Sequence, residues 1–128
     1  METLSDRKYA KTDEWVKVQA NSGRIGISDY AQDQLSDIVY VEFIKEPGDP
    51  VEKGEVFATI ESVKAAADVN SPVSGIVKEL NEALMDTPEV LNNDPYEEGW
   101  LGLIELSNES EIGDLMEAED YESYCESR

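Results

Sequence analysis

Lys64 is the residue whose position in the sequence most suggests chemistry. Gly54 lies ten residues before it and Gly75 eleven residues after it, so two segments of strand length flank it symmetrically. If these segments form a hairpin over residues 54–75, Val63 and Lys64 lie at its apex. Tight hairpins favour Asn-Gly or similar pairs, because their turns need positive φ angles, and Val-Lys supplies neither. A broken local rule is one of the few hints of a functional site that a sequence offers, although an ordinary solvated lysine is the alternative interpretation.

The other residue types exclude several kinds of chemistry. The chain has no histidine, which excludes a histidine-based triad, a histidine metal site and a histidine general base. Its single cysteine, Cys125, cannot form an intramolecular disulfide and has no cluster of metal ligands around it. The sequence therefore contains no catalytic constellation, and we expect no enzymatic activity from the isolated chain.

The charge of the chain limits its partners. Asp and Glu total 30 against 10 Lys and Arg, for a formal net charge of −20 in 128 residues. Such a chain repels phosphate backbones, so nucleic acid is excluded as a partner. It favours proteins with basic docking faces, unless the acidity only aids solubility. No apolar run approaches membrane-spanning length, and the first residues, METLSDRKYAKTDEW, resemble neither a secretory signal nor a transit peptide. These features predict a soluble cytoplasmic protein with no membrane contact.

Short alternating segments separated by turn residues predict a mainly β fold. A short helix is predicted over 29–35, with Ser28 as its cap. Beyond residue 108 the pattern changes to helix, and a short helical turn can form near Glu89. Strands are predicted over 15–18, 24–27, 38–43, 76–80 and 100–106. The turns between them are predicted at 21–23 and 47–50.

The segment around Lys64 has two possible structures. Its apolar residues occupy even positions before the centre and odd positions after it, as in two strands joined by a turn. The same residues also fit helical spacing, and ESVKAAA consists of good helix formers. Turn residues at both ends, Gly54 and the group Asn70-Ser71-Pro72 with Gly75, favour the hairpin.

Several blocks of the sequence resemble those of a known family. The blocks YAKTDEWV, GISDYAQDQLSDIVYVE, ESVKAAADVNSPVSGIV and NNDPYEEGWL are similar to those that define the H proteins of the glycine cleavage system, and the similarity runs from about Tyr9 to Tyr124. The resemblance implies two antiparallel sheets in the barrel-sandwich hybrid of lipoyl and biotinyl carriers, with a short internal helix and C-terminal helices at about 108–127. It also implies one lipoyl-carrier domain over 1–128.

The resemblance assigns Lys64 as the point to which lipoic acid is joined through an amide bond. Biotin carriers usually flank their lysine with methionines, whereas Val63 and Ala65 stand here and favour lipoate. Glu61 matches an acidic position that helps present the lysine to the lipoate-attaching enzyme, although a solvated strand charge would look the same.

A shuttle is the function that the resemblance implies. A pyridoxal-phosphate glycine decarboxylase loads an aminomethyl group on the lipoyl arm, an aminomethyltransferase removes it, and a dihydrolipoamide dehydrogenase reoxidises the arm. Two alternatives stay open: a lipoyl carrier for another pathway, such as sulfur oxidation or a lipoyl relay, and an unmodified acidic interaction module.

The loaded arm carries an ammonium group, which a cleft with a carboxylate would shelter from water. The resemblance points to Glu14 and Asp68 as the acidic wall of such a cleft, with Thr12 where the family often has serine; ordinary strand-end charges are the alternative. Three departures from the family pattern, namely Asp13 for histidine, Ala67 for serine and Ser36 for glycine, leave the attachment site intact and concern the docking of the arm.

Overall fold

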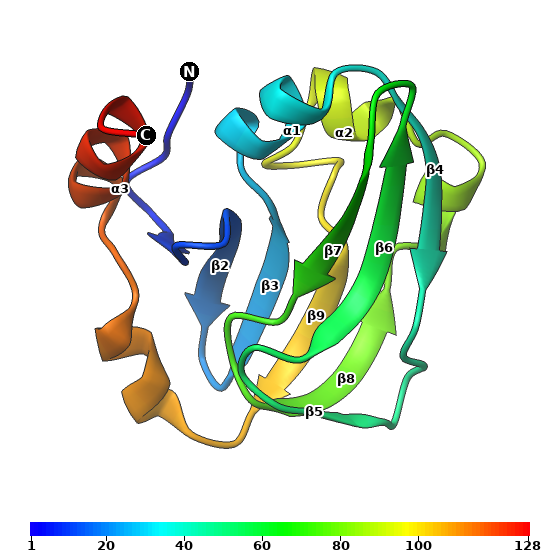
Figure 1. The fold of residues 1–128 in the computed structure, drawn as a ribbon. Helices are drawn as coiled ribbons and strands as arrows, with labels where there is room; N and C mark the ends of the chain where they lie inside the picture. Colours follow the sequence, from blue (N-terminus) through cyan, green and yellow to red (C-terminus); the bar gives the residue numbers. More distant parts are fainter.

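The computed structural model describes all residues 1–128 and contains two antiparallel sheets (Figure 1). The first sheet has six strands in the order β1-β2-β3-β9-β8-β5, and the second has three in the order β4-β6-β7. The strands are β1 (Lys8–Tyr9), β2 (Glu14–Gln19), β3 (Ser22–Ile27), β4 (Ile38–Phe43), β5 (Pro50–Val51), β6 (Val56–Ser62), β7 (Ala66–Asn70), β8 (Gly75–Leu80) and β9 (Gly102–Leu106). The predicted mainly β fold with two antiparallel sheets is confirmed.

Five short helices connect or flank the sheets. They are α1 (Asp29–Leu35), η1 (Glu82–Met85), α2 (Val90–Asn93), η2 (Glu109–Asp114) and α3 (Ala118–Glu126), of which η1 and η2 are 3-10 helices. The predicted cap is present, because the Ser28 hydroxyl accepts a hydrogen bond from the Ala31 amide at 3.1 Å. In Figure 1, α1 and α2 lie beside the turn that joins β6 to β7, whereas α3 lies near the N-terminus. No helix is long and apolar enough to cross a membrane.

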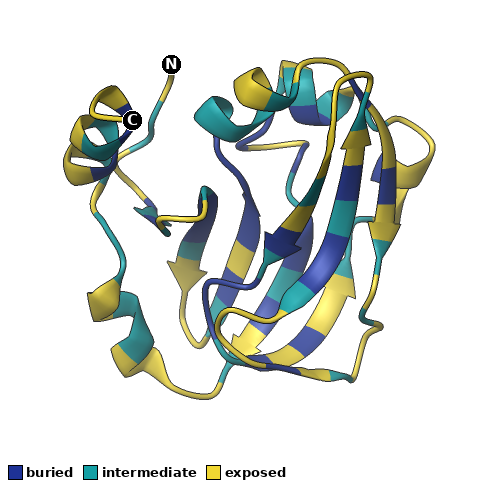
Figure 2. Cartoon of the chain, viewed as in Figure 1, coloured by how far each residue is buried: buried dark blue, intermediate teal, exposed yellow.

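The main core fills the space between the two sheets. Figure 2 shows buried stretches of β3, β6 and β9 in the middle of the molecule and exposed residues around its outside. Fully buried residues such as Ile25, Phe57, Ile60 and Ile104 come from both sheets. Alternation in β8 and β9 supplies part of the apolar inner face that such a two-layer fold must bury, whereas β2 and β3 bury three consecutive residues each.

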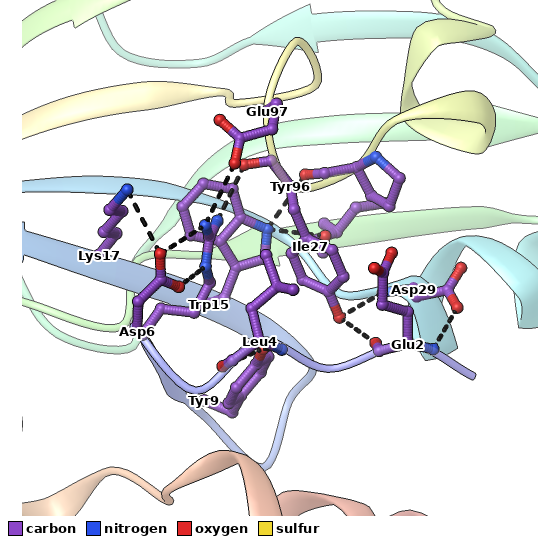
Figure 3. Close-up of polar contacts among 12 residues, drawn as sticks. Glu2, Leu4, Asp6, Tyr9, Trp15, Lys17, Ile27, Asp29, Tyr96 and Glu97 are labelled. Carbon is purple, nitrogen blue, oxygen red and sulfur yellow. Dashed lines mark hydrogen bonds and ion pairs between the residues drawn. The ribbon is translucent and has the colours of Figure 1, made fainter.

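A second cluster, of four aromatic residues and Cys125, joins the N-terminal segment and α3 to the six-stranded sheet. Figure 3 shows its contacts with the N-terminal segment. The Tyr9 ring stacks on Tyr121 of α3, with ring centroids 4.6 Å apart. Trp15 is fully buried, and its indole N–H donates to the carbonyl oxygen of Ile27 at 2.9 Å. The Tyr96 hydroxyl donates to the carbonyl oxygen of Glu2 at 2.6 Å. β1 and β2, at one edge of the six-stranded sheet, are thus held against α3 and the N-terminal segment.

The segment 54–75 forms the hairpin, and its helical alternative is wrong. β6 pairs with β7 over five residue pairs, from Val56↔Asn70 to Glu61↔Ala66. Gly54 marks a turn as predicted, with φ at 88°. Gly75 does not mark a turn, because it begins β8 and lies so close to β9 that a Cβ would be 1.9 Å from the carbonyl oxygen of Glu105. This position needs glycine because the neighbouring strand leaves no room for a Cβ, and not because a turn requires it.

Several predicted boundaries differ from the structure by one or two residues, among them one turn and the start of the last strand. The hairpin between β2 and β3 turns at Ala20 and Asn21, not at residues 21–23, since Gln19 pairs with Ser22. Ala20 has φ at 55°, which a two-residue hairpin loop demands at its first position but which alanine seldom adopts. The last strand begins at Gly102 rather than at residue 100.

Candidate functional site

The turn at Val63 and Lys64 is built by the side chain of Ser62. The Ser62 amide donates to the carbonyl oxygen of Ala65 at 2.8 Å, which closes a four-residue turn. The Ser62 hydroxyl oxygen accepts from the amides of Lys64, at 3.1 Å, and of Ala65, at 2.9 Å. Neither central residue has a positive φ. The turn is therefore stabilised by a side-chain hydroxyl that accepts from its amides, and not by the positive φ angles that Asn-Gly provides in other hairpins. Sequence reasoning missed Ser62, although a serine before a turn was the available signal.

The turn is also tied to the segment between α1 and β4. The amide of Val63 donates to the carbonyl oxygen of Asp37 at 3.0 Å. The Lys64 ammonium lies 3.5 Å from the carbonyl oxygen of Gln34 on α1, makes no ion pair, and is exposed. Val63 beside it is 69% exposed. The main chain at the apex is therefore fixed, while the side chain of Lys64 is exposed and makes no ion pair.

A small cleft opens next to this turn, between α1, the β1–β2 connection and the β6–β7 hairpin. Its volume is about 170 Å³. Three of the residues predicted for an arm cleft, Thr12, Glu14 and Asp68, line it together. Gln34 also lines it, so the residue that contacts the Lys64 amine stands at the cleft as well. The remaining lining residues are Asp13, Ile27, Ala31, Leu35, Ile60, Ala67 and Val69.

Glu14 is the unusual group in this cleft, because its carboxyl is buried without a cation. Only 2% of the residue is exposed. One carboxyl oxygen is hydrogen-bonded to the Thr12 hydroxyl, and the other accepts from the Asn70 amide at 3.1 Å. Loss of solvent raises the pKa of Glu14 from 4.5 to about 7, although both hydrogen bonds favour the ionised form. Asp68, in contrast, is exposed.

The remaining predicted residue, Glu61, and the three departures from the family pattern are placed differently with respect to the cleft. Glu61 is exposed near the end of β6 and does not line the cleft. Ala67 and Asp13 line the cleft, so two of the three departures from the family pattern do bear on it. The third, Ser36, has φ at 64° and ψ at −151° after α1, a conformation that favours glycine.

The buried carboxyl makes stability depend on pH. Because the pKa of Glu14 is higher in the folded than in the unfolded chain, its contribution to the free energy of unfolding is complete below about pH 4.5 and is lost as the pH rises through 7. A glutamine keeps both hydrogen bonds, with its carbonyl toward Asn70 and its NH2 toward the Thr12 hydroxyl. We therefore expect Glu14→Gln to exceed the unmodified wild type in stability at pH 8 by roughly 2–3 kcal/mol, since a pKa difference of one corresponds to about 1.4 kcal/mol.

Urea denaturation of both proteins at pH 5 and pH 8 measures this difference. The advantage of the variant should shrink to below about 1 kcal/mol at pH 5. The exposed Glu61→Gln is the matched control, because it removes the same charge without desolvation. An advantage of Glu14→Gln that stayed the same at both pH values would show that the carboxyl does not titrate as stated.

The fold and the site together define a class of protein. An exposed lysine stands at a hairpin apex whose main chain is held by hydrogen bonds, next to a small cleft. This arrangement is that of a carrier protein, which holds a prosthetic group on a lysine and presents it to enzymes. The cleft has room for part of such a group: six of its eleven lining residues are apolar, and the buried carboxyl of Glu14 is bonded to Thr12 and Asn70 rather than to a cation.

Comparison with known proteins identifies the carrier. The family model described as "Glycine cleavage H-protein" matches residues 7–128. The chain is 52% identical over 126 residues to the glycine cleavage system H protein of Clostridium botulinum, which covers 98% of this chain and 95% of the relative. It is 48% identical over 123 residues to glycine cleavage system H protein 2, mitochondrial, of Arabidopsis thaliana, over 96% of this chain and 78% of the relative. The crystal structure of a glycine cleavage system H protein from Mycobacterium marinum matches with a TM-score of 0.86 and 32% identity, over 94% of this chain and 97% of the other.

The chain belongs to the glycine cleavage H-protein family. Proteins of this family are the non-catalytic lipoyl carriers of the glycine cleavage system, and the other components of that system are their partners.

Proposed function

We propose that Lys64 is the residue that carries lipoic acid, through an amide bond to its side-chain nitrogen. The observation that supports this assignment is the exposed amine, free of ion pairs, at an apex whose main chain is held by Ser62 and Asp37. A fixed base with a long flexible side chain presents the group in a defined direction and lets it sweep a small volume. Residues 1–128 act as one lipoyl-carrier domain in this proposal.

When bound, lipoic acid supplies a cyclic disulfide that can accept a one-carbon amine and two electrons. The chain contributes the tether, which raises the effective concentration of that disulfide at each partner. The partners we propose are the pyridoxal-phosphate glycine decarboxylase, the aminomethyltransferase and the dihydrolipoamide dehydrogenase. A lipoate-attaching enzyme loads Lys64 and contacts the exposed Glu61 three residues before it. A cytoplasmic location stays a prediction.

Glu14 and Asp68 form the acidic wall of a shelter for the cationic cargo of the arm, with Thr12 beside them. The shared cleft and the burial of Glu14 support this role. An ammonium placed against the Glu14 carboxylate would replace the missing counter-charge and exclude water from the cargo. Loss of the cargo requires water, because hydrolysis converts the S–CH2–NH3⁺ group and one water into a thiol, formaldehyde and ammonium.

Removing the carboxylates of Glu14 and Asp68 is therefore expected to expose the cargo. We expect the pair Glu14→Gln and Asp68→Asn to accelerate hydrolytic loss from the loaded arm by about tenfold or more, which is the effect of losing roughly 1.4 kcal/mol of charge-assisted hydrogen bonding. The measurement is the release of formaldehyde over time from the loaded protein. Glu42→Gln together with Glu79→Gln, both exposed and outside the cleft, should leave the rate unchanged. Equal rates in all three proteins would refute the shelter.

The decisive experiment on the proposed function is the mass of the protein purified from its native cell. Intact-mass measurement followed by peptide mapping should show the fixed mass of one lipoyl group on the peptide that contains Lys64. A native protein without that mass would overturn the assignment and would favour an unmodified acidic interaction module. Lipoylation at another lysine would retain the carrier function but refute the site.

A further inference from the structure

Asp13 lies between two cleft residues, Thr12 and Glu14, in a conformation that needs support. Its φ is 81°, in the left-handed region that costs energy for residues other than glycine. Three donors converge on its carboxylate. Arg128 donates from both terminal nitrogens, at 2.5 and 3.1 Å, and the Tyr121 hydroxyl donates at 2.8 Å. The turn that carries Thr12 and Glu14 is thus held by residues more than a hundred positions away.

The same network reaches the opposite wall of the cleft. The hydroxyl oxygens of Tyr121 and Ser28 lie 2.6 Å apart, within hydrogen-bond distance. Ser28 caps α1 by accepting from the amide of Ala31, a cleft residue. The Ser28 amide in turn donates to the carbonyl oxygen of Asp13 at 2.9 Å. The β1–β2 connection and α1 are therefore joined through Asp13, Tyr121 and Ser28.

Arg128 is itself held in place. Its guanidinium lies over the rings of Tyr30 and Tyr124, 4.5 and 4.8 Å from their centroids. Its side chain is 28% exposed and that of Asp13 is 17% exposed. A two-nitrogen contact stacked between aromatic rings has a defined geometry, unlike a flexible surface pair. A second ion pair between β1 and the start of α3, from Lys8 to Glu117, joins the same parts of the molecule but does not reach the cleft.

We propose that Arg128 is a positioning residue for the arm cleft, acting through Asp13 to fix the turn that carries Thr12 and Glu14. It also neutralises Asp13, which leaves Glu14 free to ionise when a cation arrives. This inference rests on the proposed role of the cleft. It assigns a task to α3 and its end that neither the fold nor the attachment of the arm requires.

The charges facing Glu14 determine whether removal of Arg128 makes its carboxyl easier or harder to ionise. The ionisable residues that line the cleft are Asp13 on the β1–β2 connection, Glu14 itself and Asp68 on β7; α1 and β6 contribute none. Asp13 already opposes the ionisation of Glu14. If Arg128 is removed, the negative charge of Asp13 acts without compensation, and a higher pH is needed to ionise Glu14.

The first measurement uses unmodified protein and needs no arm. The carboxyl carbon of Glu14 is followed by NMR as a function of pH in wild type, Arg128→Gln, Arg128→Lys and Lys8→Gln. We expect Arg128→Gln to lower the ionisation constant of Glu14 by about threefold to tenfold, a range typical of one nearby charge at partial burial. Arg128→Lys should recover most of this change because it keeps the charge. Lys8→Gln, which breaks the other ion pair of α3, should match the wild type.

The second measurement is the loss of cargo from the loaded arm in the same proteins and in Glu14→Gln. Arg128→Gln should accelerate it at least threefold, and Lys8→Gln should not. If Arg128→Gln behaves like Lys8→Gln in both measurements while Glu14→Gln still accelerates the loss, this inference is wrong and the cleft stands. If Glu14→Gln leaves the loss unchanged, the proposed cleft itself fails, whatever the NMR titration shows.

Discussion

Replacing Lys64 by arginine is expected to abolish lipoylation and to reduce glycine–carbon dioxide exchange with the decarboxylase partner by roughly 10²–10⁴-fold. Arginine keeps the positive charge and much of the length of lysine, but its guanidinium stays protonated and is not an amine that a lipoate-attaching enzyme can acylate. Without the tether, the reaction depends on free lipoate in solution. The expected loss is then the effective concentration that tethering normally provides.

Lys78→Arg is the matched control, because Lys78 is an exposed strand lysine on β8 away from the hairpin apex. It should be lipoylated at Lys64 and should support full exchange. Both variants should unfold at the same temperature as the wild type, since neither side chain is buried. Exchange at wild-type rates by Lys64→Arg would contradict the assignment of the arm to this residue.

Replacing Gly75 by alanine is expected to destabilise the fold by roughly 3 kcal/mol or more, which lowers Tm by about 10–20 °C for a chain of this size. The new Cβ would lie 1.9 Å from the carbonyl oxygen of Glu105 and 2.8 Å from Cγ2 of Ile104. One of these atoms belongs to the backbone of β9, so no rotation of a side chain can relieve the overlap. β8 must move away from β9, which opens the six-stranded sheet beneath the main core. Thermal unfolding by circular dichroism measures the effect.

Gly113→Ala provides the comparison for Gly75→Ala. Gly113 lies in η2 with no heavy atom within 4 Å of the added Cβ, so we expect its stability to stay within about 0.5 kcal/mol of the wild type. If Gly75→Ala unfolded at the same temperature as Gly113→Ala, the result would contradict the requirement for glycine where β8 approaches β9.

Local patterns in the sequence were sufficient for the elements near Lys64. The change of parity at Val63, the turn at Gly54 and the cap at Ser28 each involve neighbours within a few residues, and the structure contains all three features. Helical spacing over the same segment was a competing local fit, against which the turn residues at both ends favoured the hairpin. Pairing with β4, which lies outside the segment, makes the strand the stable choice, since a helix there would leave the three-stranded sheet without its centre.

The sequence by itself determined the mainly β class, the lysine at a chain reversal, the absence of histidine chemistry and, through resemblance, the carrier family. The tertiary structure alone decided that Glu14 is buried without a cation, that Gly75 is required by a neighbouring strand, and that Arg128 contacts Asp13 across 115 positions. The physical reason is that burial and charge pairing depend on which distant segments pack together. Periodicity indicates which face of an element is apolar, but it does not indicate what that face will meet.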